Sequence, residues 1–244
     1  MEQEKIIEKF KEIKYNDGLI LIEHIINNEY DDNLLKNIII SLSENKNKYT
    51  YEIYDYIIKN TIINYNICLS GSHLPDWYHL IHLCAEYGNI TLLKHLIIKG
   101  ININIKSIFH SNTSLMFASM YSNNTSSNEV VKLLLEYCAD INLQNNTGET
   151  ALMLASRNSN YTSSIETVKL LLENGADVNL KNKDGETALI QASMLSNNTS
   201  SNETVKLLLE YGADPNLQNK YGKTAYDLAS ANKYKNLIKS YMKD

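Results

Sequence analysis

The second half of the chain is one motif written four times at a constant spacing. Its copies read TSLMFAS, TALMLAS, TALIQAS and TAYDLAS, and they begin at Thr113, Thr150, Thr187 and Thr224. Each copy starts 37 residues after the previous one, as in 150 − 113 = 37. A fixed period of about 20 to 50 residues is the signature of stacked repeats. The chain is therefore predicted to form a solenoid rather than a single enzyme-like core.

Each copy is followed by a polar loop and a second apolar segment. These segments read EVVKLLLEYCADIN, ETVKLLLENGADVN and ETVKLLLEYGADPN. In the first of them Val131, Leu134 and Leu135 lie three and four residues apart, which places them on one helical face. One repeat alone cannot bury that face, so neighbouring repeats must cover it. The predicted order in each repeat is helix, loop, helix, turn.

Capping residues occur at the expected helix ends. The four threonines that open the motif suit the N-cap, where a side-chain oxygen accepts from exposed backbone N–H groups. Gly175 and Gly212 follow the second helices, where a left-handed C-cap is favoured. Cys138 stands at the equivalent position. The alignment therefore predicts that Cys138 adopts the left-handed conformation.

These residues resemble the ankyrin repeat, whose consensus reads DGxTPLHLAA followed by VVxLLLxxGADVN. DGETALIQAS with LLLENGADVNLKN is close to that pattern, and HLIHLCAEYGNITLLKHLIIKGININ is a more divergent earlier copy. The usual ankyrin period is about 33 residues. The extra residues fall in YSNNTSSN, NSNYTSSI and LSNNTSSN, which favour longer polar loops between the two helices. We expect substitutions in these loops to cost little stability.

The resemblance implies an all-α fold, an ankyrin repeat solenoid of stacked helix-loop-helix units with short hairpin turns. We assign residues 73–244 to this domain. The expected repeats are about 74–107, 108–144, 145–181, 182–218 and a capping repeat at 219–244. Residues 1–72 show amphipathic periodicity and are predicted to form an α-helical N-terminal extension. They are either degenerate ankyrin repeats or a separate module.

Composition argues against several classes of protein. The net charge of −5 argues against a nucleic-acid binder, which needs a clustered basic surface. No apolar window approaches the roughly 18 residues of a membrane span, and the N-terminus lacks a secretory apolar stretch. Three cysteines without CxxC spacing suggest neither a disulfide framework nor a zinc site. We therefore expect a soluble cytoplasmic protein without a cofactor.

Candidate catalytic and metal-binding residues are few. His73, His79, His82 and His95 lie near Cys84, but without a recognisable metal-ligand spacing. The resemblance implies instead that His82 makes hydrogen bonds between repeats. No GxSxG, P-loop or GxGxxG motif occurs. The chain is predicted not to be an enzyme, and a metal-dependent enzyme around His79 and His82 is the least favoured alternative.

In ankyrin proteins the turn tips and the inner face of the first helices form a concave strip that receives partners. The inner-helix positions carried over are Met120, Tyr121, Arg157, Asn158, Met194 and Leu195. The turn-tip positions carried over are Gln144, Asn145, Lys181, Lys183, Glu186, Gln218, Lys220 and Tyr221. Met, aromatic and Arg side chains are typical of interface centres. Alternatively, Met194 and Leu195 only pack under the polar loops.

The resemblance thus implies a non-catalytic scaffold for protein–protein interaction. The Ile-, Asn-, Lys- and Tyr-rich sequence with near-identical repeats is similar to ankyrin proteins of giant DNA viruses, which suggests a host protein as partner in the host cytoplasm. The lysines at the tips favour a partner with some acidic surface. We expect a monomer that binds neither nucleic acid nor membranes. The alternative is an adaptor whose N-terminal helices recruit a larger machine such as a ubiquitin ligase.

Overall fold

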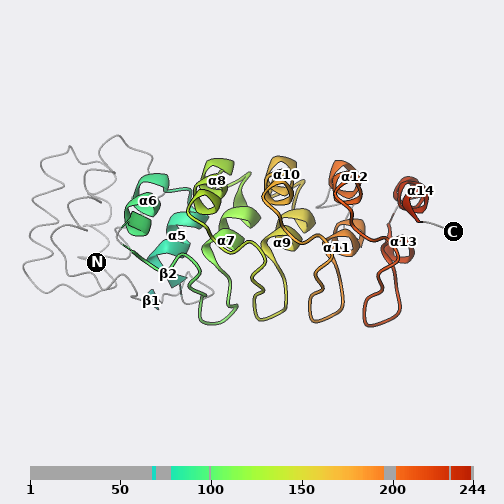
Figure 1. The fold of residues 1–244 in the computed structure, drawn as a ribbon, viewed down its shortest axis with the longest axis horizontal. Helices are drawn as coiled ribbons and strands as arrows, with labels where there is room; N and C mark the ends of the chain where they lie inside the picture. The colour runs from blue at the N-terminus through green and yellow to red at the C-terminus, as the bar shows by residue number, and fades with distance from the viewer. Residues whose placement is uncertain (1–67, 70–77, 99, 195–201, 231, 243–244) are drawn as a thin grey trace, which may run out of the picture.

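The computed structural model describes residues 68–69, 78–98, 100–194, 202–230 and 232–242. Within this part of the chain, ten helices form five successive pairs that stack in one row (Figure 1). The first helices of the pairs are α5 (Leu80–Glu86), α7 (Ser114–Tyr121), α9 (Ala151–Arg157), α11 (Ala188–Met194) and α13 (Ala225–Leu228). The second helices are α6 (Ile90–Ile98), α8 (Asn128–Glu136), α10 (Ile165–Glu173), α12 (Asn202–Glu210) and α14 (Asn232–Tyr241).

This arrangement confirms the predicted all-α repeat solenoid, with one small addition. Cys68–Leu69 (β1) pairs antiparallel with Tyr78–His79 (β2), so that Cys68 lies opposite His79. The rest of the predicted helical extension at 1–72 lies outside the described residues. No described helix is both long enough and apolar enough to cross a membrane.

Each first helix begins where the sequence places it, directly after a capping threonine. The hydroxyls of Thr113, Thr150, Thr187 and Thr224 each accept from the backbone N–H three residues on, at 3.3 Å. This bond satisfies one of the N–H groups that a helix start leaves without a partner. The N-cap prediction is confirmed in all four copies.

The core lies between the two layers of helices. The first helices α7, α9 and α11 each bury six residues, because they contact a neighbouring first helix on either side and a second helix behind them. The second helices bury one face, which includes Val168, Leu171 and Leu172 in α10. The core therefore runs through every boundary between repeats, as the apolar pattern requires.

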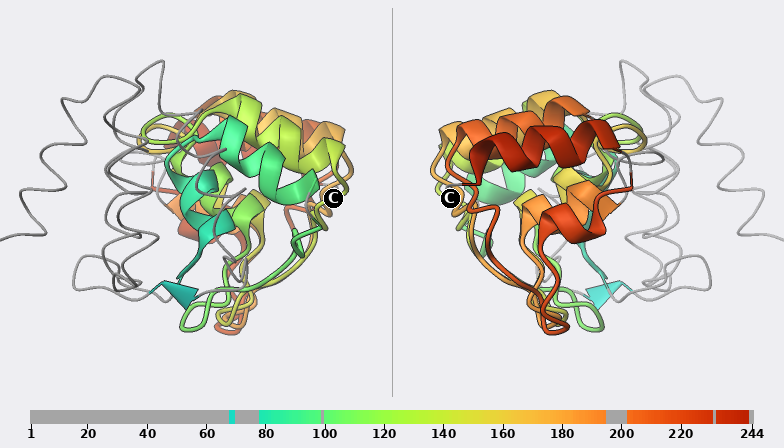
Figure 2. Two further views of the ribbon diagram at one scale, coloured as in Figure 1. Left: turned by 90° about the vertical axis from the view of Figure 1, so that its left-hand side faces the viewer. Right: turned by 90° about the vertical axis from the view of Figure 1, so that its right-hand side faces the viewer.

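Long loops join each second helix to the next first helix, and all project to the side away from the second helices (Figures 1 and 2). Their tips are linked laterally by backbone hydrogen bonds. Asn146 N–H donates to His110 O at 3.0 Å, Lys183 N–H to Thr147 O at 3.0 Å, and Lys220 N–H to Asp184 O at 2.8 Å. The four loops are therefore held side by side as one row.

A second set of bonds crosses the repeat boundaries nearer to the second helices. The Asn142 Oδ1 atom accepts from Asp177 N–H at 2.8 Å, and Asn179 Oδ1 accepts from Asp214 N–H at 2.8 Å. Each aspartate in turn accepts from the asparagine N–H two residues later, at 2.9 Å in the case of Asn179 and Asp177. The repeated ADxN element thus fixes its own turn and holds the next repeat.

The two described polar loops, which follow α7 and α9, are more buried than the sequence suggested. Ser122 and Ser163 are buried, and their hydroxyls lie 3.3 Å apart across a repeat boundary. Thr125 and Ser126 donate to the backbone carbonyls of Glu86 and Ala85, at 2.7 and 2.6 Å. Both acceptors lie in α5, the first helix of the preceding repeat. Several of these hydroxyls hold neighbouring repeats together, so the expectation of a low cost stays a prediction for the exposed loop positions such as Asn123 and Asn124.

Cys138 has φ = 61°, so the predicted left-handed conformation is confirmed. The equivalent Gly175 has φ = 87°, and a Cβ built there would meet no atom within 4 Å. A side chain at this position therefore costs conformational energy only, on the order of 1 kcal/mol. Replacing Cys138 with Gly should raise the melting temperature by roughly 2 to 4 °C. Gly175→Cys, the reverse change, should lower it, and a Cys138→Gly protein that melts no higher would contradict the assignment.

Leu171 is fully buried at the boundary between α10 and its neighbours. Leu171→Ala should lower the free energy of unfolding by about 2 to 5 kcal/mol, because it leaves a cavity in the core. Asn124, an exposed loop residue, is the control, and Asn124→Ala should change stability by less than about 0.5 kcal/mol. Urea unfolding measures both. Equal losses from the two substitutions would be inconsistent with this core.

Candidate binding surface on the inner face

We define the inner face as the surface formed by the C-terminal ends of α7, α9 and α11, which is bordered by the loop tips. Met120, Arg157 and Met194 occupy equivalent positions on these three helices, and all three side chains are partly exposed. The structure thus brings the described inner-helix candidates into one row. Leu195, another candidate, lies outside the described residues.

Arg157 is held in place by a carboxylate from the loop before its own helix. Its Nη1 lies 2.5 Å from Oε1 of Glu149, and the Arg157 side chain remains 32% exposed. Glu149 is only 9% exposed, and its other oxygen accepts from the Thr147 hydroxyl at 3.0 Å. A charge-assisted bond to a carboxylate that is itself fixed gives the guanidinium a defined orientation. The Arg157 guanidinium is therefore positioned before any partner arrives.

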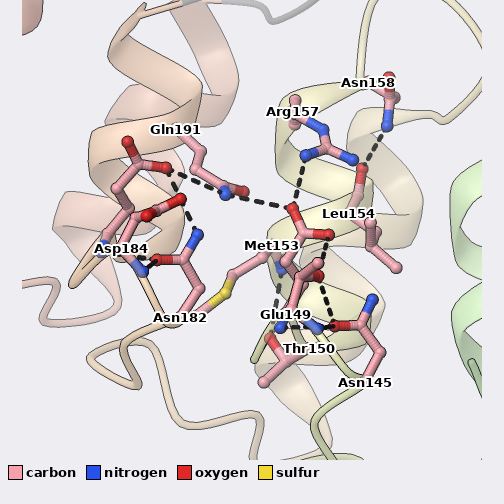
Figure 3. Close-up of polar contacts among 12 residues, drawn as sticks. Asn145, Glu149, Thr150, Met153, Leu154, Arg157, Asn158, Asn182, Asp184 and Gln191 are labelled. Atoms are coloured by element: carbon pink, nitrogen blue, oxygen red, sulfur yellow. Dashed lines mark hydrogen bonds and ion pairs between the residues drawn. The ribbon is translucent and has the colours of Figure 1, made fainter. Parts of the chain in front are cut away.

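Gln191 extends this network across a repeat boundary (Figure 3). Its Nε2 lies 3.3 Å from Glu149 Oε1 and 3.4 Å from Glu186 Oε2. Glu186 also accepts from the Asn182 side chain at 3.4 Å. A single amide thus joins carboxylates from two successive loops, and the ends of α9 and α11 are tied to a common set of hydrogen bonds.

The other two inner-helix candidates, Asn158 and Tyr121, interact with residues close to them in the structure. Asn158 Nδ2 donates to the carbonyl of Leu154 at 2.8 Å, so the Asn158 side chain helps to terminate α9. Burial, with a smaller contribution from the charge of Glu86, raises the pKa of Tyr121. Its hydroxyl therefore stays protonated over the neutral range and is available as a hydrogen-bond donor or acceptor.

Among the tip candidates, Gln144 and Asn145 stabilise the second loop. Gln144 Nε2 donates to the carbonyls of Gly148 and Lys181, at 2.6 and 2.9 Å. Asn145 Oδ1 accepts from the backbone N–H groups of Thr147 and Glu149, at 3.0 and 2.9 Å. These two side chains are directed into the loops and are only partly exposed.

The remaining tip candidates Lys181, Lys183, Gln218, Lys220 and Tyr221 are exposed, whereas Glu186 is half-buried in the Gln191 network. Lys181 Nζ donates to Gln218 O at 2.8 Å, and Lys220 Nζ lies 2.5 Å from Asp184 Oδ1. The hydrogen bond to Asp184 is the main reason that the pKa of Lys220 is raised. The lysine ammonium groups are thus at the surface and charged.

His82 is fully buried, and its Nε2 lies 3.0 Å from the carbonyl oxygen of Ile105 in the loop that leads to the next repeat. The bond from His82 to Ile105 stays within the expected repeat 74–107, so it is not the bond between repeats that the resemblance implies. The His82 ring instead packs against Phe117 of the next repeat, with 5.5 Å between the ring centres.

Burial raises the pKa of Cys84, which disfavours the thiolate that a metal would need. Within the described residues, no three His, Cys, Asp or Glu side chains gather as metal ligands would. His73 lies outside these residues.

The sequence reasoning named Arg157 and Glu186 but missed Glu149 and Gln191. A signal for Gln191 was present, because it replaces the apolar residue found at the same position in the other copies, Phe117 and Leu154 among them. A polar side chain on the buried side of a helix needs a partner. The pairing itself was not visible, because Gln191 and Glu149 are 42 residues apart.

The fold and this surface define a class of protein: a repeat scaffold that presents an extended face built from successive, equivalent units. The sequence agrees, because the family model for ankyrin repeats (3 copies) matches residues 81–182 and 159–240. Together these matches span residues 81–240, which is 160 of the 244 residues. The chain belongs to the ankyrin repeat family, whose domains are generally non-catalytic modules for protein–protein interaction. No curated protein matches the chain in sequence.

Removing the Glu149 carboxylate should destabilise the domain. Glu149→Ala leaves Arg157, Thr147 and the Gln191 amide without a shared acceptor, and we expect a loss of about 1 to 3 kcal/mol in urea unfolding. Glu173→Ala is the matched control, since Glu173 lies on the outer helix α10 in an exposed ion pair with Lys169 at 3.7 Å. Exposed pairs contribute less than about 1 kcal/mol. A Glu173→Ala loss as large as that of Glu149→Ala would argue against a special role for the network.

Proposed function

We propose that this chain is a non-catalytic scaffold that binds another protein through its inner face. The observation that carries the proposal is the fixed orientation of Arg157 between two partly exposed methionines on neighbouring helices. Methionine adapts to varied apolar surfaces, and arginine is enriched among residues that dominate binding energy. The row therefore combines an adaptable apolar contact with a directional polar one.

Arg157 retains hydrogen-bonding capacity for a partner. Its contact with Glu149 uses Nη1, and Nε and Nη2 make no hydrogen bond to any described residue. Guanidinium groups present five N–H donors in a rigid planar arrangement. Because Glu149 and Gln191 fix this group in the free protein, less conformational entropy is lost on binding. A partner carbonyl or carboxylate is the acceptor that this geometry favours.

The cellular setting is a proposal from sequence alone. We propose a monomer in the cytoplasm, with a host protein as partner if the chain comes from a giant DNA virus, and without nucleic-acid or membrane binding. The division into residues 1–72 and 73–244 belongs to the same proposal. The adaptor alternative assigns recruitment of a larger machine to residues 1–72, and it predicts that the full chain captures proteins that residues 73–244 do not.

Affinity capture from cell lysate, with quantification of the bound proteins, tests the inner face. The inner-face variant is Arg157→Gln with Met194→Asn. We define the outer side as the surface formed by the second helices and the turns that follow them. The control is Lys132→Gln with Tyr137→Asn, which also removes one cation and one exposed large apolar side chain but on the outer side. We expect the inner-face variant to bind the captured protein at least tenfold more weakly, about 1.4 kcal/mol.

The melting temperatures of both variants must stay near that of the unmodified chain. A loss of binding can then be assigned to the changed surface and not to unfolding. Calorimetry with the purified partner then gives the affinities. Binding that survives the inner-face variant and is lost in the outer-side control would refute the proposed surface.

A further inference from the structure

The exposed charges of the repeats are separated onto two surfaces. The repeats that contain α8, α10 and α12 each present the same three carboxylates and one lysine on the outer side, all of them exposed, for a net charge of −2 per repeat and −6 over three repeats. These residues are Glu129, Lys132, Glu136 and Asp140, then Glu166, Lys169, Glu173 and Asp177, then Glu203, Lys206, Glu210 and Asp214.

The loop tips carry the opposite charge. We define the tip row as residues 106–112, 143–149, 180–186 and 217–223, which are equivalent segments of the four loops. Its exposed ionised side chains are five lysines and one aspartate, for a net charge of +4 with His110 neutral: Lys106, Lys181, Lys183, Lys220, Lys223 and Asp184. Glu149 and Glu186 occupy the position of Lys223 in the two preceding loops, but they are less exposed and are tied to Arg157 and Gln191; with these two carboxylates counted, the net charge of the row is +4 − 2 = +2. In a chain of net charge −5, a basic row of this kind is a local feature.

The tip row is rigid because its loops touch backbone to backbone. A Cβ on Gly148 would lie 2.8 Å from the backbone nitrogen of Lys183, and one on Gly185 would lie 2.9 Å from that of Lys220. Such distances are too short for any residue with a side chain. The glycines therefore permit the close approach that places the lysine-bearing loops at fixed positions, and binding need not order them first.

The contacts within the row leave most of the positive charge uncompensated. Lys106 Nζ and Lys181 Nζ donate to backbone carbonyls of the next loop, at 2.7 and 2.8 Å, and a carbonyl carries no net charge. Lys183 makes no side-chain contact to the described residues. Lys223 lies close enough to Asp227 to contribute, after the hydrogen bonds with Thr224, to lowering the pKa of that carboxyl. Among the lysines of the row, only Lys220 forms an ion pair with a described residue, Asp184. An incoming carboxylate would therefore meet ammonium groups that still lack counterions.

The two ends of the tip row differ in polarity. The first loop exposes Ile108 and Phe109, at 54% and 55%, where the later loops have polar residues. The last loop exposes Tyr221 at 70%, with Lys220 Nζ 5.1 Å from the centre of its ring. The row thus exposes Ile108 and Phe109 beside Lys106 at its N-terminal end, whereas four of its five lysines lie in the last two loops.

We propose that the tip row binds an extended acidic segment of a partner protein, with apolar side chains of that segment on Ile108 and Phe109 and its carboxylates on the lysines of the last two loops. Neighbouring helices pack about 10 Å apart, so three intervals between four tips span about 30 Å. At about 3.3 Å per extended residue, the segment has roughly nine residues. This inference rests on the proposed function and names the chemistry of the partner.

A nucleic acid is the other polyanion that lysines bind, and the charge distribution disfavours it. The row offers only five exposed lysines and also carries Asp184, whereas affinity for a phosphate backbone comes from a clustered basic surface that neutralises many successive phosphates. A short segment with carboxylates at one end meets only the lysines. The tip row therefore fits an acidic peptide better than a phosphate chain.

Selection from a random twelve-residue peptide library displayed on phage, with the full chain as bait, tests this inference. Enriched peptides should contain an excess of Asp and Glu together with an apolar cluster separated from them. One enriched peptide, labelled with fluorescein, is then titrated by fluorescence anisotropy. Its affinity should fall at least tenfold in Lys183→Glu/Lys220→Glu/Lys223→Glu and should weaken as salt is raised from about 0.05 to 0.5 M.

The matched control is Lys132→Glu/Lys169→Glu/Lys206→Glu, which makes the same change of charge on the outer side and should alter the affinity by less than twofold. Basic or uncharged enriched peptides, no enrichment at all, or equal losses in the two triple variants would overturn the inference. So would tighter binding of a labelled single-stranded oligonucleotide at the same lysines. Peptides lost only in Arg157→Gln/Met194→Asn would overturn it while leaving the proposed inner-face function intact.

Discussion

The contact between successive repeats is the constraint on which the rest of this structure depends. A pair of short helices cannot bury its own apolar faces, so α7, α9 and α11 are each enclosed by the first helices before and after them and by a second helix behind. The polar groups follow the same rule. Buried hydroxyls such as those of Ser122 and Ser163, and the bonds of Asn142 and Asn179 to the next repeat, all cross the boundaries. Stability therefore resides between repeats at least as much as within them.

That constraint also creates the surfaces. Because the loops must lie side by side, their tips form a continuous row. A partner that binds there therefore interacts with the charges of several loops at once. The inner-helix ends form a second row in the same way, where Arg157 lies between Met120 and Met194. The two rows differ in chemistry: a fixed guanidinium with apolar neighbours on the helices, and ammonium groups on the loops. A partner that contacts both would meet an apolar strip bordered by positive charge.

Much of the fold was predictable because the signals for it are local or periodic. The 37-residue spacing predicts the stacked helix pairs, the threonines predict the helix starts, and the alignment of Cys138 with Gly175 predicts a left-handed backbone. Less of the candidate surface was predictable. Ser163 looks like a solvent-exposed loop residue in sequence, yet it is fully buried, since a serine satisfied by a neighbouring repeat is as compatible with burial as an apolar residue. The Gln191 network depends on a contact over 42 residues that no periodicity encodes.

The hydrogen bonds that cross the boundaries between repeats have an equal spacing in sequence, and this spacing affects how the number of repeats in such a chain can change. Asn142 to Asp177 and Asn179 to Asp214 each span 35 residues, and Thr147 to Lys183 and Asp184 to Lys220 each span 36. Duplication or loss of one whole unit would therefore recreate the same bonds at the new junction. The bond from Gln191 to Glu149 has no equivalent at the other described boundaries. A new junction that separated Glu149 from Gln191 would therefore lose this bond, whereas the repeating bonds would form again.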